Sequence, residues 1–323
     1  MTPGRWPVHP APLPGEALSS WLRRVAFPYG ATVEDLVADL GFWPGSAADL
    51  DICPPGRFAQ ELSNRTGVGA HRIRRMSLSG WSPLLLDTTE PDPQMFTNYT
   101  RQFSVLLPAG RRRIRDIYPW LPWRPSRPAM RACPQCIATT TPPHPYQLLW
   151  LLPVTLSCPQ HGCLLVAHAW PVVDFRDWRR KPPPPTTVSP TLLAMDIRTW
   201  QGLATGSVDL LRLPISAGTW FRLIRTIIDE LGATLTECGN ARSTMMKAWV
   251  EAGHLFRMGP LSWHTHEDYQ PSSQILALEA TATAIRLLET NALVGRGPDT
   301  AFFQSDRRLP NYGGVRLAAG LGR

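Results

Sequence analysis

The strongest constraint on the fold is a pair of four-residue motifs, Cys-Pro-Gln-Cys at 133–136 and Cys-Pro-Gln-His at 158–161. We call residues 133–136 the first knuckle and residues 158–161 the second knuckle. Each knuckle offers two sulfur or nitrogen ligands on one tight turn, and two such turns complete the tetrahedron that zinc prefers. The motifs therefore predict one structural zinc ion with four ligands: Cys133, Cys136, Cys158 and His161.

Two other kinds of site compete with a structural zinc. A thioredoxin-type redox pair would lie where a strand enters a helix of a βαβ unit, and no such pattern surrounds Cys133. A catalytic zinc would keep one position open to water and have a general base nearby, but no Glu lies between the knuckles. The fourth ligand stays open, because His144, Cys163 or His168 could replace His161.

The segment between the knuckles shows alternating apolar residues at Tyr146, Leu148, Trp150, Leu152 and Val154. A period of two is typical of a strand, so the spacing predicts a strand or hairpin packed beside the metal. The whole module is therefore predicted to be a small zinc ribbon.

Proline clusters divide the chain into predicted segments. The 34 prolines gather in connectors near 7–14, 119–128, 142–145 and 182–185. The pattern predicts a mainly α fold with one small metal module. Its segments are an extended N-terminal segment at 1–14, a helical region with helix-turn-helix units at 15–118, the zinc-ribbon module at 119–181 and a helical C-terminal region at 182–323.

The N-terminal region carries two copies of the spacing found in helix-turn-helix units. A small residue is followed four positions later by a Gly that permits a left-handed turn, and six positions after that by an apolar residue. Two tandem matches predict a duplicated helical pair: Ser63, Gly67, Ile73 and Ala26, Gly30, Leu36. A further helix is predicted from its N-cap Thr32 to Gly41.

The C-terminal region carries two long helical patterns. The stretch AGTWFRLIRTIIDELG has a broad apolar stripe and predicts a helix that ends at Gly232. The stretch SSQILALEATATAIRLLET repeats this pattern. HTHED at 264–268 is predicted to be a surface loop, and the residues after Asn291 are predicted to form a loosely held tail.

Basic residues mark candidate nucleic-acid contacts. The net charge of +8 favours an anionic partner. Arg side chains can bind phosphates or pair with guanine. The candidates are His71, Arg72, Arg74 and Arg75 on the second helix of the predicted helix-turn-helix, and Arg111, Arg112 and Arg113 in a basic run. The alternatives are a solvated basic face, or a surface that binds protein or RNA.

The sequence shows no pattern typical of a membrane protein or an enzyme. No apolar run reaches the ~20 residues of a membrane helix, and the N-terminus lacks a signal-peptide pattern, which predicts a cytoplasmic protein. Phosphate-binding loops, His-Glu-x-x-His and nucleophile elbows are missing. Acidic residues such as Asp196 and Glu237 show no grouping for a two-metal site, so a non-enzymatic protein is predicted.

Three stretches together resemble the TniQ family, which is related to TnsD: PLPGEALSSWLRRVAFPYG, TGV followed by RMSL within 66–78, and CPQC followed by LSCPQHGCLL. The resemblance implies a transposition adaptor that recognises target DNA or a DNA-bound complex, CRISPR RNA-guided complexes included. It implies recruitment of an AAA+ ATPase regulator and of the transposase. It also implies a helix-turn-helix at about 56–80 and zinc ligands at Cys133, Cys136, Cys158 and His161.

A second function is compatible with the same residues: a sequence-specific transcription regulator with a structural zinc site. An adaptor is expected to bind an ATPase and to show weak sequence preference alone, whereas a regulator is expected to bind a palindromic site tightly. The sequence leaves open the target DNA, a CRISPR effector as partner, and a homodimer.

Overall fold

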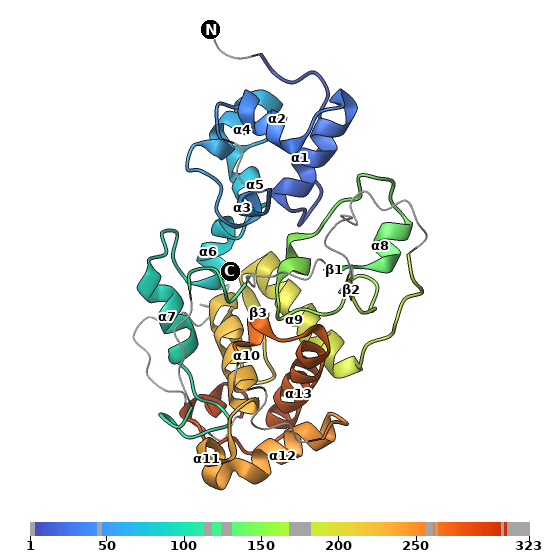
Figure 1. Ribbon diagram of the computed structural model, residues 1–323. Coiled ribbons are helices and arrows are strands. Elements are labelled where there is room, and N and C mark those ends of the chain that lie inside the picture. The colour runs from blue at the N-terminus through green and yellow to red at the C-terminus, as the bar shows by residue number, and fades with distance from the viewer. Residues whose placement is uncertain are drawn as a thin grey trace, which may run out of the picture. The chain divides into compact units, whose positions relative to one another are not determined.

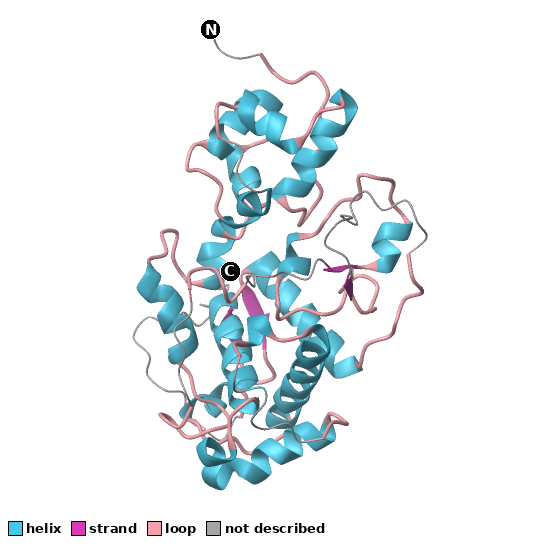
Figure 2. Cartoon of the chain, viewed as in Figure 1, coloured by secondary structure: helices cyan, strands magenta, loops and turns pink. Residues whose placement is uncertain are grey.

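The computed structural model describes residues 4–43, 47–112, 118–123, 131–167, 182–255, 261, 264–304 and 307–308. Within these ranges helices dominate, as the sequence predicts, and the strands are two or three residues long (Figure 2). The chain divides into two compact units. The first comprises 1–82, 128–152 and 165–186, and the second comprises 83–127, 153–164 and 187–323. The predicted segment boundaries at the proline clusters remain a prediction.

The first unit contains short helices and one small antiparallel pair of strands (Figure 1). Its helices and 3-10 helices are α1 (Leu18–Ala26), η1 (Phe27–Tyr29), α2 (Val33–Asp39), α3 (Ala47–Ile52), α4 (Phe58–Thr66), α5 (Ala70–Arg74), η2 (Ser79–Trp81), α8 (Pro134–Ala138) and η3 (Leu148–Leu151). Strand β1 (Arg131–Ala132) pairs with β2 (Val166–Ala167).

The helices α1 to α5 enclose one apolar core. Trp21 and Leu22 of α1, Phe58 of α4 and Ile73 of α5 are all fully buried in it. The extended N-terminal segment packs on this core, because the indole of Trp6 donates to Asp39 Oδ2 at 2.9 Å. The core thus orders a set of helices that are each too short to be stable alone.

The left-handed turns predicted at two glycines are confirmed. Gly30 has φ +62° after η1 and Gly67 has φ +74° after α4. Helix α2 begins at the predicted cap, since Thr32 and Asp35 form a reciprocal capping box. The tandem spacing therefore predicts the local turns correctly, while a DNA-binding helix-turn-helix remains a prediction.

The second unit contains the longer helices (Figure 1). Its elements are α7 (Pro93–Arg101), α9 (Pro190–Thr205), α10 (Ala217–Leu231), α11 (Leu235–Cys238), η5 (Gly239–Ala241), α12 (Arg242–Glu251), η7 (His266–Asp268), α13 (Pro271–Glu289), η8 (Pro298–Phe302) and the antiparallel strands β3 (Ser207–Asp209) and β4 (Pro214–Ser216). Helix α6 (Ser82–Leu85) lies where the first unit ends. No helix in the described ranges is long and apolar enough to cross a membrane.

Helix α10 is the centre of this unit and contacts α7, α9 and α13. The predicted end of the helix is confirmed, because Gly232 is its C-cap. Burial extends beyond the apolar stripe to two arginines. Arg222 pairs with Asp87 at 2.7 Å, and Arg225 pairs with Glu267 at 2.7 Å. These partners satisfy the charges that the helix brings into the core.

Two predictions for the C-terminal region are wrong. HTHED is no surface loop, because His266 and Glu267 are buried and Glu267 binds Arg225. The residues after Asn291 are no loose tail over their described part, because Asp299 and Phe302 are buried. Asp299 accepts the backbone N–H of Ser104 at 2.7 Å, which ties this segment to the core of the unit.

Candidate metal centre and basic surface

The first knuckle is the start of a short helix. Cys133 is the N-cap of α8, and its Sγ accepts the backbone N–H of Cys136 at 3.5 Å. Pro134 occupies the first helical position, where a fixed φ and a missing N–H cost nothing. The two cysteines therefore lie on one turn of the chain.

The second knuckle is a tight hairpin turn. The N–H of Cys158 donates to the carbonyl of Cys163 at 2.9 Å, and the N–H of Gly162 donates to the carbonyl of Cys158 at 2.8 Å. Gly162 has φ +60°, a left-handed conformation that favours glycine. An antiparallel bridge between Ser157 and Leu164 closes the turn at its base.

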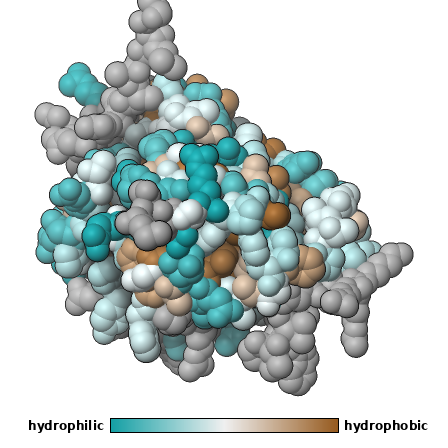
Figure 3. Space-filling view, turned by 90° about the horizontal axis from the view of Figure 1, so that it is seen from above, coloured by the Kyte–Doolittle hydropathy of each residue, from teal (hydrophilic) through white to brown (hydrophobic). Residues whose placement is uncertain are grey.

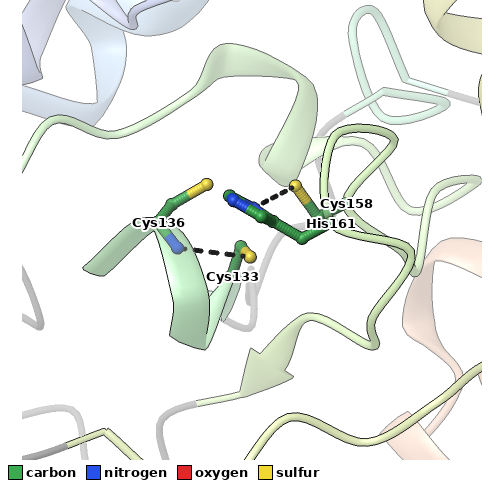
Figure 4. Close-up of side chains that lie close together, drawn as sticks. All are labelled: Cys133, Cys136, Cys158 and His161. Carbon is green, nitrogen blue, oxygen red and sulfur yellow. Dashed lines mark hydrogen bonds between the residues drawn. The ribbon is translucent and has the colours of Figure 1, made fainter. Parts of the chain in front are cut away.

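The structure brings the four predicted ligands together (Figure 4). The Sγ atoms of Cys133, Cys136 and Cys158 and a ring nitrogen of His161 all lie within 4.8 Å of one another. Zinc with bonds of about 2.3 Å to sulfur would space its ligand atoms by about 3.8 Å in a tetrahedron, so the cluster has the right size for one ion. Cys133 and Cys158 are buried, which shields such an ion from water.

The geometry favours His161 over the other candidates for the fourth ligand. His144 is buried and its Nδ1 lies 2.8 Å from Thr140 Oγ1. Cys163 is not a member of the cluster, although its carbonyl takes part in the hairpin. His168 lies outside the described residues.

The predicted strand between the knuckles is wrong. Residues Leu148–Leu151 form the 3-10 helix η3. Leu149 and Leu151 are buried as well as the alternating residues, so the apolar run is buried on all sides. The alternation therefore does not distinguish a buried face from an exposed one and does not indicate a strand. Pro153 follows this helix and offers no N–H for a ladder, which also disfavours a strand.

The second knuckle is supported by a side chain that no motif in the sequence indicates. Asp196 of α9 is fully buried. Its Oδ2 accepts the backbone N–H of Ser157 at 2.7 Å and the hydroxyl of the same residue at 2.6 Å. Because 39 residues separate the two partners, no local spacing could indicate the contact.

The basic candidates differ in their surroundings. His71, Arg72, Arg74 and Arg75 are exposed on or directly after α5, whose apolar residue Ile73 faces the core. Arg72 also donates to the carbonyl of Pro12, so part of its hydrogen-bonding capacity is used within the protein.

The basic run after α7 also contains one exposed arginine and one that binds another residue of the protein. Arg111 is exposed, whereas Arg112 is half-buried and binds Asp229 Oδ2 at 3.1 Å. Arg113 lies outside the described residues. Figure 3 shows hydrophilic and hydrophobic side chains interspersed on one face of the molecule.

The exposed side chains on and directly after α5 are the stronger candidate for binding a partner's phosphates, because they outnumber the exposed arginine of the described basic run.

Residues up to the second knuckle thus combine short helices around one core with a Cys3His cluster that could hold a metal ion. The TniQ family model matches residues 7–165, a span that includes α1 to α5 and both knuckles. The chain therefore contains a TniQ family domain, as its sequence resemblance predicts, and a domain of this family implies a protein of transposition target selection. No curated protein matches the chain, and no solved structure does.

Proposed function

We propose that the protein is a non-enzymatic adaptor that selects targets for DNA transposition. It would recognise target DNA, or a DNA-bound complex such as an RNA-guided CRISPR effector, and recruit an AAA+ ATPase regulator and the transposase. The observation that carries this proposal is the TniQ family match over residues 7–165.

The proposed role of the metal is structural. Three thiolates and one imidazole supply the four ligands that tetrahedral zinc needs, which leaves no position for a reacting water. Zinc would stabilise the fold around the knuckles, since a structural zinc contributes its binding free energy to folding. The chain's own residues then provide the surfaces that partners bind.

A reconstituted transposition reaction tests the adaptor role. We expect insertion at a preferred target to require this protein together with the matching ATPase and transposase, and we expect the purified protein to bind that ATPase directly. Tight binding to a palindromic DNA site, with no binding to the ATPase, would contradict the adaptor and favour a transcription regulator.

The proposed nucleic-acid surface is tested by removing two exposed charges at α5. The double variant Arg74→Ala, Arg75→Ala keeps the backbone carbonyls that accept from Ser77 Oγ and Trp81 Nε1. If both side chains bind phosphates, affinity for DNA should fall and the salt dependence should lose roughly two ions.

The matched control removes two exposed charges from the C-terminal helices, Arg242→Ala with Arg286→Ala. Both double variants lower the net charge by the same amount, so only a local contact distinguishes them. Equal affinity and equal salt dependence for the two variants would rule out a specific role for α5.

A further inference from the structure

The second knuckle is supported by residues that lie beyond the TniQ family match. Within the unit that contains residues 153–164, Thr187 forms an antiparallel bridge with Cys163. The ring Nε2 of His266 lies 3.1 Å from the carbonyl of Pro153. A Cβ added at Gly162 would lie 3.4 Å from Leu193 Cδ2, so α9 packs closely on the turn.

Asp196 makes the most specific of these contacts. Its Oδ2 accepts from the hydroxyl and the N–H of Ser157, at 2.6 and 2.7 Å, and from the N–H of Leu156 at 3.2 Å. Leu156 and Ser157 directly precede Cys158. The carboxylate therefore fixes the backbone from which the Cys158 thiolate projects.

The arrangement has a physical reason. Buried backbone N–H groups need acceptors, and neither Leu156 nor Ser157 donates to a helix or to a regular strand ladder. The three converging donors offset the cost of burying a polar carboxyl group in α9.

We propose that Asp196 is a positioning residue for the metal centre. Through it, helix α9 sets the affinity of the Cys3His cluster for zinc, although α9 lies outside residues 7–165. This inference rests on the proposed binding of zinc. Residues that orient metal ligands typically change metal affinity by roughly 10- to 100-fold when mutated, and we expect a loss in this range for Asp196→Asn.

The test measures zinc affinity of the full-length chain by competition with a chromophoric chelator. Glu230→Gln is the matched control, because Glu230 is a buried carboxylate of the same unit that also accepts two backbone N–H groups and a serine hydroxyl. These donors belong to Ser104, Val105 and Leu106, which are not part of the metal cluster. We expect Asp196→Asn to lose zinc affinity and Glu230→Gln to keep it.

A milder variant keeps the test decisive if Asp196→Asn fails to fold. Ser157→Ala removes only the hydroxyl donor and leaves both backbone N–H bonds to the carboxylate, so a loss of up to roughly tenfold is expected. Co²⁺ in place of zinc gives a second readout, since its absorption spectrum reports the tetrahedral thiolate geometry.

The outcomes separate the two proposals. Zinc affinity that falls no further in Asp196→Asn and Ser157→Ala than in the Glu230→Gln control would overturn the positioning role. A wild-type chain that binds neither zinc nor Co²⁺ would instead overturn the proposed metal centre itself, before any variant is compared.

Discussion

The two knuckles share nearly the same sequence but are supported differently. Within the first knuckle, Cys133 caps α8 and receives the N–H of Cys136, and strand β1, which directly precedes Cys133, pairs with β2. The second knuckle rests on Asp196, which is distant in sequence and accepts from the residues just before Cys158. Nearly identical motifs therefore predict which residues could hold a metal ion but not the groups that hold those residues in place.

The second unit uses a buried carboxylate for another irregular segment as well. Glu230 of α10 accepts the N–H of Leu106 at 2.6 Å and that of Val105 at 3.0 Å. In segments 104–106 and 156–157 alike, backbone N–H groups that lie outside the helices and named strands donate to a buried side-chain carboxyl group.

The largest effect is expected from loss of the metal. In the variant Cys133→Ser, Cys136→Ser, bound zinc should fall from about one ion to none, because two of the four proposed ligands are removed. The effect on folding should be large, because zinc binding contributes roughly 10–16 kcal/mol of free energy in zinc-finger peptides. Hydrogen exchange should then accelerate at the amides of Cys136 and Ile137. The amides of Leu156 and Ser157 should keep more of their protection, since Asp196 still accepts from them.

The control for this variant is Cys53→Ser, because Cys53 is exposed and lies outside the cluster. It should retain the zinc and the exchange pattern of the wild type. Equal loss of protection at both knuckles would contradict the difference in support, and retention of zinc would contradict the ligand set.

A smaller effect is expected from the pH dependence of the Glu230 contact. Burial raises the pKa of Glu230 to about 7, although Arg112 and the hydrogen bonds from Leu106 and Val105 oppose the shift. A raised carboxyl pKa contributes stability that is complete below the unfolded pKa, near 4.5, and is lost as the pH rises through about 7. The free energy of unfolding should therefore fall across this window.

The variant Glu230→Gln isolates this contribution, because glutamine does not titrate. Chemical denaturation at several pH values should show that the stability difference between wild type and variant becomes smaller from pH 4.5 to pH 7. Parallel pH profiles for the two chains would show that the 104–106 segment is not held by a titrating carboxyl group.

The smallest effect is expected at the turn of the second knuckle. Gly162→Ala forces a left-handed conformation on an L-residue, which costs about 1–2 kcal/mol. Gly56→Ala is the control, because Gly56 has no positive φ and a Cβ there meets nothing within 4 Å. Thermal unfolding of both zinc-loaded variants measures the difference, and equal midpoints would contradict the strained turn.

Several features of the fold follow from sequence alone because their causes are local. Gly30 and Gly67 end helices at the predicted positions, Thr32 caps α2, and Gly232 ends α10. The cluster of four residues that could hold a metal ion also agrees with the sequence, because each knuckle is only four residues long. Such signals depend on the φ of one residue or on neighbours within one turn.

The errors arise where a distant partner decides the outcome. The sequence around Glu267 predicts a polar loop, yet Glu267 is buried and forms an ion pair with Arg225 of α10. Asp196 is an isolated acidic residue in the sequence, yet its carboxyl group accepts a hydrogen bond from the backbone N–H of Ser157. Apolar alternation between the knuckles predicts a strand, but complete burial removes the distinction between the two faces. Tertiary contacts of this kind leave no local pattern in the chain.

X-ray absorption at the zinc edge of the full-length protein tests the central claim most directly, that both knuckles close one structural metal site. The predicted spectrum has three sulfur neighbours at about 2.3 Å and one nitrogen neighbour at about 2.0 Å, with about one zinc per chain. A site with fewer sulfur neighbours and a bound water oxygen would contradict the closed Cys3His centre.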